Sequence, residues 1–214
     1  MWFFKKKAIE AVCFELHDVV VRVRLDGYKN YASQAFGCSS EQLEQAVARH
    51  WSELETGKVR PEQFWDLVGA SLKELGVAHS TSGSRFRGIW EGVVSDSAQV
   101  DSEVLNTVRQ VKDLKFRTVA SANLTQELSL IYQKLGVFEP FSLTCISSRI
   151  GERKPTPNYF NRMRKLALTS PSCCLYVDKD EQNLKAAKSA GFQTLPFTSV
   201  GDARRELIER GVLH

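Results

Sequence analysis

CLYVDKDEQNLKAAKSAG, residues 174–191, is the stretch that decides the fold. It opens with four largely apolar residues, which are typical of a buried strand, and turns polar at Asp178. A helical pattern then runs over residues 181–190, and Gly191 is the residue type that most often ends a helix. A short buried strand, a polar turn and a helix together indicate one βα unit of a parallel sheet.

The same unit recurs through the second half of the chain. We expect strands over residues 116–120, 142–146, 174–177 and 193–197, and helices over residues 101–114, 125–135, 158–168, 181–190 and 202–210. A further buried strand is expected over residues 8–16, where an apolar run ends at the polar pair His17-Asp18. Strands that alternate with helices predict right-handed crossovers and a parallel, Rossmann-like sheet.

Between the first strand and the others, the pattern is helical throughout. Four helices with long polar faces are expected, over residues 28–36, 40–54, 61–75 and 84–93. Ser39 and Gln42 form the sequence of a capping box, Gly57 marks a helix end, and Pro61 suits a first helical turn. We therefore predict an α/β core of residues 1–21 and 96–214, with an all-helical cap of residues 22–95 inserted after the first strand. The cap aromatics are expected in its own core, although some of them could line a substrate mouth or a dimer face: Trp51, Phe64, Trp65, Phe86 and Trp90.

Composition narrows the classes of partner. The net charge is +4, and apart from Lys5, Lys6 and Lys7 the basic residues are scattered, so we do not expect a nucleic-acid partner. No apolar stretch is long enough to span a bilayer, and residues 1–4 precede lysines, the reverse of the order in a signal peptide. A cytoplasmic location is therefore predicted. The five cysteines lack the spacing of a zinc site and are expected to be free thiols.

Polar residues gather where the predicted strands end, which is where ligands bind in open α/β sheets. The first strand ends in Glu15 and His17, and the second in Ser121, Ala122 and Asn123. The third leads into GERKPTP, residues 151–157, which carries Lys154, and the fourth ends at Asp178 and Lys179. The order along the chain is therefore acid, hydroxyl, lysine, acid.

This order resembles the haloacid dehalogenase (HAD) superfamily, most of whose members are magnesium-dependent phosphatases. The resemblance runs from about residue 9 to residue 200, and ELETGKVRPEQFW, residues 53–65, resembles the cap of its small phosphatases with a helical cap. The resemblance implies that Glu15 stands at the position of the attacking carboxylate and His17 at that of the acid/base. It implies that Ser121, Ala122 and Lys154 hold the phosphoryl group, with Lys154 also in the catalytic set, and that Glu15, His17 and Asp178 surround Mg²⁺.

The first motif departs from the family's pattern, which is Asp-x-Asp. Glutamate at position 15 is one methylene longer, so its carboxylate is displaced by roughly 1.5 Å, and a misplacement of about 1 Å can slow a reaction on the order of 100-fold. Glu15 could be a surface acid paired with Lys154 in an inactive site, a metal ligand that does not attack, or a slow nucleophile. His17 could be a simple polar loop residue. Lys179, where many relatives carry an acid, either weakens Mg²⁺ binding or faces solvent.

Three hypotheses about function follow. The first is a catalytically impaired HAD-like protein that retains a phosphate- or anion-binding pocket and acts by binding a small phosphorylated molecule or a protein partner. The second is a slow Mg²⁺-dependent phosphomonoesterase that acts on a small phosphorylated metabolite. The third is an interaction protein whose cap mediates homodimerisation or another assembly.

Overall fold

A computed structural model describes residues 8–23, 32–78, 92 and 94–214 of the chain. Its main sheet has five strands, in the spatial order β5 (Leu143–Ile146), β4 (Arg117–Ala122), β1 (Ala11–Glu15), β6 (Cys174–Asp178) and β7 (Gln193–Pro196). All four pairings between neighbouring strands are parallel. The predicted α/β class with a Rossmann-like parallel sheet is confirmed.

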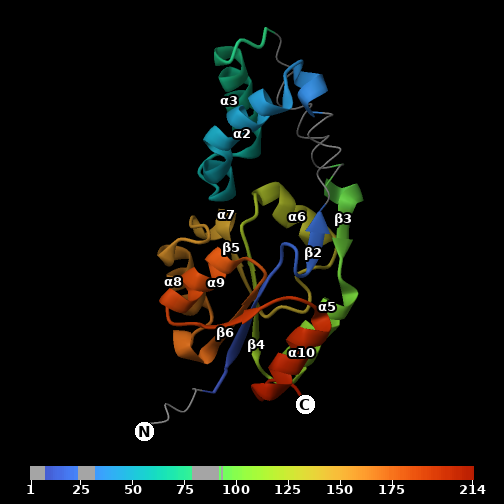
Figure 1. Cartoon of the computed structure of the whole chain (residues 1–214), viewed down its shortest axis with the longest axis vertical. Coiled ribbons are helices and arrows are strands. Elements are labelled where there is room, and N and C mark those ends of the chain that lie inside the picture. Colours follow the sequence, from blue (N-terminus) through green and yellow to red (C-terminus); the bar gives the residue numbers. More distant parts are fainter. Residues whose placement is uncertain (1–7, 24–31, 79–91, 93) are drawn as a thin grey trace.

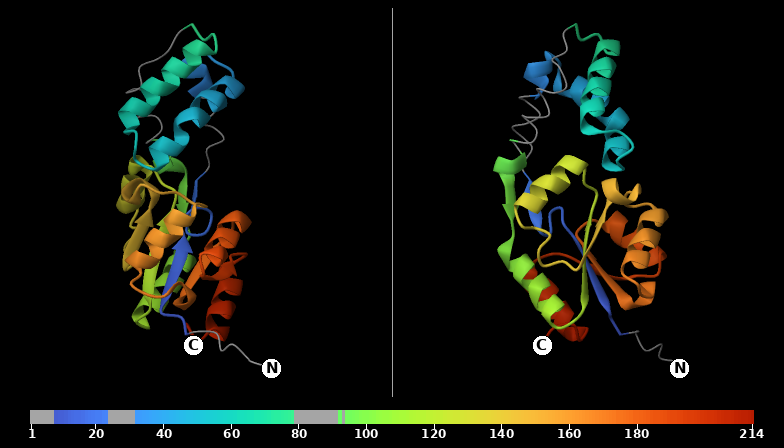
Figure 2. Two further views of the ribbon diagram at one scale, coloured as in Figure 1. Left: turned by 90° about the vertical axis from the view of Figure 1, so that its left-hand side faces the viewer. Right: turned by 180° about the vertical axis from the view of Figure 1, so that it is seen from behind.

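Helices cover both faces of this sheet, as Figures 1 and 2 show. One face packs on α5 (Ser102–Asp113), α6 (Gln126–Lys134) and α10 (Val200–Glu209), and the other on α8 (Pro157–Leu166) and α9 (Glu181–Ser189). The alternation of side chains along β1 produces this division. Val12 and Phe14 belong to the first core, whereas Cys13 belongs to the second. Because β1 is buried on both faces, it has the continuous apolar sequence of a central parallel strand.

The cap stands over the carboxyl ends of the sheet strands (Figure 1). Its described helices include α2 (Ser40–Glu55) and α3 (Pro61–Glu74), which pack against each other. At its base, β2 (Val21–Val23) pairs antiparallel with β3 (Ala98–Val100). This two-stranded ribbon was not predicted, because three residues are too few for an alternating pattern to show. The predicted core and cap boundaries stay a prediction.

The local signals that predicted the cap helices are confirmed. Ser39 and Gln42 make the reciprocal hydrogen bonds of a capping box at the start of α2, at 2.9 and 3.2 Å. Phe64 and Trp65 are buried in the cap core, with their rings 5.0 Å apart, while Trp51 is half-buried. Phe86 and Trp90 lie outside the described residues, as do residues 84–91 and 93 of the predicted helix around them and residues 28–31 of the first predicted helix.

Two short elements were also missed: α7 (Ser147–Ile150), which follows β5 directly and ends at the left-handed Gly151, and the 3₁₀ turn η1 (Pro171–Cys173) before β6. All five cysteines are free thiols, as expected. No helix in the described part of the chain combines the length and the apolar character needed to cross a bilayer.

Candidate functional site

Three of the predicted site residues meet at the carboxyl end of the sheet. Glu15 ends β1, Asp178 ends β6, and Lys154 lies in the loop between α7 and α8. The Lys154 ammonium forms an ion pair with the Glu15 carboxylate and lies 3.9 Å from Oδ2 of Asp178. All three residues are less than 5% exposed. Glu15 is therefore paired with Lys154, which was one of the alternatives for it, but the pair is buried rather than at the surface.

The backbone of Lys154 is fixed by Asn123, which follows β4. The Oδ1 atom of Asn123 accepts a hydrogen bond from the Lys154 N–H at 2.8 Å, and its Nδ2 donates to the Lys154 carbonyl oxygen at 3.0 Å. The peptide bond between Lys154 and Pro155 is cis. Sequence reasoning gave Asn123 no role, although its position directly after a strand was the available signal.

Asp178 is held by three donors. Its Oδ1 accepts from the Asp180 N–H at 2.9 Å, and its Oδ2 accepts from Nδ2 of Asn183 at 3.0 Å and from the hydroxyl of Tyr176. The same Tyr176 hydroxyl lies 3.5 Å from Oε2 of Glu15, so Tyr176 connects the two acids. Tyr176 was not predicted, because a tyrosine inside an apolar strand carries no sequence signal that its hydroxyl reaches a site.

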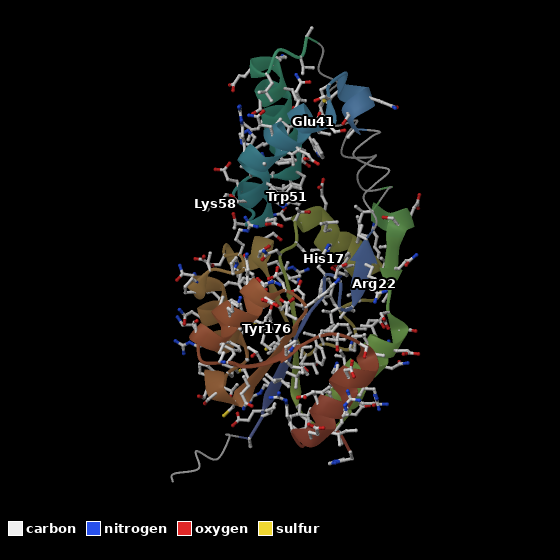
Figure 3. All side chains as sticks on the ribbon, in the orientation of Figure 1. His17, Arg22, Glu41, Trp51, Lys58 and Tyr176 are labelled. Carbon is white, nitrogen blue, oxygen red and sulfur yellow. The ribbon has the colours of Figure 1, made fainter. Side chains whose placement is uncertain are left out.

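His17 and Lys179 lie at the rim. The His17 N–H donates to Oε1 of Glu15 at 3.1 Å, while its side chain is exposed and borders the pocket beneath the cap (Figure 3). Nζ of Lys179 lies 3.8 Å from Oδ2 of Asp18, and the two side chains are 63% and 50% exposed. Lys179 therefore faces largely toward solvent, as one of its two alternatives had it.

Ser121 and Ala122 are buried in β4 and do not line the pocket. The Ser121 hydroxyl lies 3.0 Å from the hydroxyl of Tyr159, a buried residue of α8. Ser121 pairs with Glu15 in the sheet register, so its side chain lies on the same face as that of Glu15, the face covered by α8. The phosphate-binding role of both residues stays a prediction.

The pocket has a volume of about 560 Å³ and opens between the core and the cap. Its lining combines strand-end residues with residues from α2 and α6: Glu15, His17, Asp18, Trp51, Glu55, Asn123, Leu128, Lys154, Asp178, Lys179, Asp180 and Asn183. Glu55, at the end of α2, is joined to the core twice. Its carboxylate lies 2.9 Å from the Arg153 guanidinium, and its carbonyl oxygen accepts from the Ser147 hydroxyl at 2.6 Å.

The charges around the pocket leave it negative. Five acids and two lysines line it, and Arg153 adds a third positive charge beside it. Three ion pairs, those of Glu15, Asp18 and Glu55, leave the charges of Asp178 and Asp180 in excess. Burial lowers the pKa of Lys154 to about 8, while the carboxylates of Asp178 and Asp180 act in the opposite direction. The N-terminus of α9, which Asp180 caps, offsets part of the excess.

The residues present include ligands of the kind that Mg²⁺ uses. Glu15 and Asp178 supply two buried carboxylates in a pocket with excess negative charge, and Mg²⁺ usually binds through one or two carboxylates while keeping several waters. The Lys154 ammonium pairs with Glu15 and lies 3.9 Å from Asp178. Within residues 8–23, 32–78, 92 and 94–214, no group of three potential ligand side chains comes together. The predicted role of His17 as a ligand stays a prediction.

Comparison with known proteins identifies relatives of this fold. No family model matches the chain. Flavin mononucleotide hydrolase 1, chloroplastic, of Arabidopsis thaliana is 24% identical, over 97% of this chain and 80% of its own length. A HAD family enzyme from Bacteroides thetaiotaomicron is 18% identical, with a TM-score of 0.73, over 94% of this chain and 99% of that chain. It has also been solved with magnesium, and with magnesium and inorganic phosphate.

A HAD-like family hydrolase from Porphyromonas gingivalis is 16% identical, with a TM-score of 0.73, over 94% of this chain and 98% of its own. These likenesses extend over both the sheet and the cap. The chain therefore has the same fold as these enzymes of the HAD family, which confirms the fold that the resemblance of its strand-end residues predicted.

Proposed function

We propose that this is a catalytically impaired HAD-like protein that binds a small phosphorylated molecule in the pocket between core and cap. One observation carries the proposal: both carboxylate oxygens of Glu15 already have partners. Oε1 accepts from the His17 N–H, and Oε2 forms the ion pair with Lys154. The residue at the position of the attacking group is thereby engaged with the residue at the position of the phosphate-binding cation.

The ion pair impairs two functions at once. Covalent phosphoryl transfer needs a carboxylate oxygen free to approach phosphorus in line with the leaving group. It also needs the lysine to stabilise the charge on the phosphoryl oxygens. Because Glu15 and Lys154 bind each other, neither is free for its part. The imidazole of His17 can both donate and accept a proton, as an acid/base group must, so proton transfer is the smaller defect.

Binding of a phosphorylated ligand is expected to depend on a divalent cation. The two excess negative charges of the pocket oppose a phosphate dianion, for which Lys179 supplies the ammonium group that Glu15 does not hold. Glu15 and Asp178 would hold Mg²⁺, which supplies charge neutralisation when bound. The solved complex of the Bacteroides thetaiotaomicron enzyme with magnesium and inorganic phosphate supports this proposal.

Hydrolysis of p-nitrophenyl phosphate with Mg²⁺ tests the impairment. We expect the wild type to turn over far more slowly than a typical enzyme, whose kcat is about 10 s⁻¹. Glu15→Asp combined with His17→Asp should raise the rate by on the order of 100-fold, because the shorter carboxylate withdraws from Lys154. The proposal is wrong if the wild type works at a typical rate and Lys154→Ala abolishes that activity.

A slow Mg²⁺-dependent phosphomonoesterase is the second candidate. Similarity to a flavin mononucleotide hydrolase along 97% of the chain favours it and makes flavin mononucleotide the first substrate to test. Release of more than one phosphate per protein molecule over several hours would support turnover. Saturable binding of flavin mononucleotide without phosphate release would support the first proposal. Assembly through the cap stays a third prediction, and light scattering at micromolar concentration tests it. The predicted cytoplasmic location also stays a prediction.

A further inference from the structure

The cap contributes an aromatic side chain to the pocket, Trp51. It is on α2 and half-buried, and it lines the pocket together with Leu128 of α6. Figure 3 shows it at the foot of the cap, above the core. Behind it, the ring of Phe64 makes an edge-to-face contact, with centroids 6.0 Å apart and planes at 71°. Phe64 is fully buried, so the indole rests against a fixed part of the cap.

Contacts one turn further along hold this ring over the sheet. Glu55 follows Trp51 by four residues, so the two share one helix face. Burial raises the pKa of Glu55, while the charge of Arg153 and a hydrogen bond from Trp51 act in the opposite direction. Glu55 is bound to Arg153 and Ser147 of the core. At Gly57, a Cβ atom would lie 2.5 Å from the carbonyl oxygen of Ser148, so only glycine allows this close approach. These contacts fix the foot of the cap on the core, with the indole of Trp51 lining the pocket.

The lining of the pocket combines charged and apolar groups. The strand ends and loops of the core supply Lys154, Asp178 and Lys179, and Trp51 of α2 and Leu128 of α6 are its large apolar side chains. A volume of about 560 Å³ lies within the range of pockets for small organic ligands and far exceeds what phosphate alone occupies. Tryptophan offers a large, rigid and planar apolar surface, against which another planar ring stacks with a favourable offset.

We propose that Trp51 determines the specificity of this pocket by stacking on the ring of a phosphate monoester that carries a planar aromatic group. This inference rests on the proposed function, because it requires the phosphate to bind at the charged groups of the pocket. Leu128, on the core side, covers the edge of the bound ring. Aliphatic phosphate esters and inorganic phosphate make only the charged contacts and bind more weakly.

Calorimetry with phenyl phosphate and inorganic phosphate, both in the presence of Mg²⁺, tests the proposal on the full chain. We expect the wild type to bind phenyl phosphate roughly ten- to a hundredfold more tightly, the range for stacking of a base on an aromatic side chain. Trp51→Ala should remove this preference and leave the affinity for inorganic phosphate unchanged, while Trp51→Phe keeps most of it. Trp65→Phe is the matched control, since Trp65 lies in the same cap but does not line the pocket.

The outcomes separate the two proposals. If inorganic phosphate binds and Trp51→Ala leaves the preference for phenyl phosphate intact, the role of Trp51 is overturned and the proposed function stands. If Trp51→Ala weakens both ligands equally while its circular dichroism matches the wild type, the role of Trp51 is likewise overturned. If neither ligand binds the wild type, with or without Mg²⁺, the proposed function falls and this inference falls with it.

Discussion

Lys154→Met is the sharpest test of how the buried charges are balanced. The change keeps a long side chain but removes the ammonium that pairs with Glu15 and lies 3.9 Å from Asp178. Both carboxylates are less than 5% exposed, so they would remain buried without their cation. Removing one partner of a buried ion pair costs about 3–5 kcal/mol. We expect the free energy of unfolding to fall by that amount.

Urea unfolding followed by circular dichroism at pH 7, with a chelator present, measures the loss. With a slope of about 2 kcal/mol per molar urea, a loss of about 4 kcal/mol lowers the midpoint by about 2 M. Mg²⁺ should then restore part of the stability of Lys154→Met, because a divalent cation replaces the missing ammonium. At one hundred times its dissociation constant, a ligand stabilises by about 2.7 kcal/mol. The wild type should gain less, since its lysine competes with the metal.

Lys179→Met is the matched control. It removes a lysine from the same pocket, but one whose side chain is 63% exposed and whose partner Asp18 is half-exposed. Exposed ion pairs contribute about 0–1 kcal/mol, so this variant should unfold close to the wild type. The reasoning is refuted if Lys154→Met unfolds at the same urea concentration as the control. It is also refuted if Mg²⁺ does not move the midpoint of Lys154→Met.

Three further predictions concern stability. Gly57→Ala should cost about 1–3 kcal/mol more than Gly37→Ala in thermal unfolding, because both positions have positive φ but only the first would push a methyl group into a backbone oxygen; equal losses would contradict this. Burial raises the pKa of Glu55, so the wild type should lose stability as pH rises from 4.5 through the folded pKa, and Glu55→Gln should lack this component of the slope; identical pH profiles would contradict it. Tyr176→Phe removes a hydroxyl that donates to the buried Asp178 and should cost about 1.5–3 kcal/mol in urea unfolding; an unchanged midpoint would show that this bond contributes nothing.

The repeating elements could be predicted because their signals are local. The strand ending at Asp178 and the helix after it are bounded by residues that act on their own backbone, namely the capping Asp180 and the left-handed Gly191. The capping box of α2 is equally local. Because parallel strands end at one edge of the sheet, the meeting of Glu15, Lys154 and Asp178 follows from topology once those elements are known.

The details of the site could not be predicted, because they depend on side-chain direction. Ser121 lies within β4, where its buried hydroxyl contacts Tyr159, whereas Asn123 lies just past the end of the strand and lines the pocket. The two hydrogen bonds between Asn123 and Lys154 join residues far apart in the chain, so no local sequence pattern predicts them. The place of Trp51 in the pocket could not be predicted either, because its helical spacing is equally consistent with a residue of the cap core.

The order of strands in the sheet also bears on how the chain acquires its structure during synthesis. β1 is made first, yet it lies at the centre of the sheet, between β4 and β6, and the inserted cap separates it from both. Its two backbone edges therefore stay unpaired until most of the chain has been made, while the helices of the cap can form from local contacts. The acid at the end of β1 can meet its lysine only after the chain has been made past β5, and Asp178 joins them only with β6. Formation of the pocket is thus a late event of folding, and ligand binding reports on a completed core.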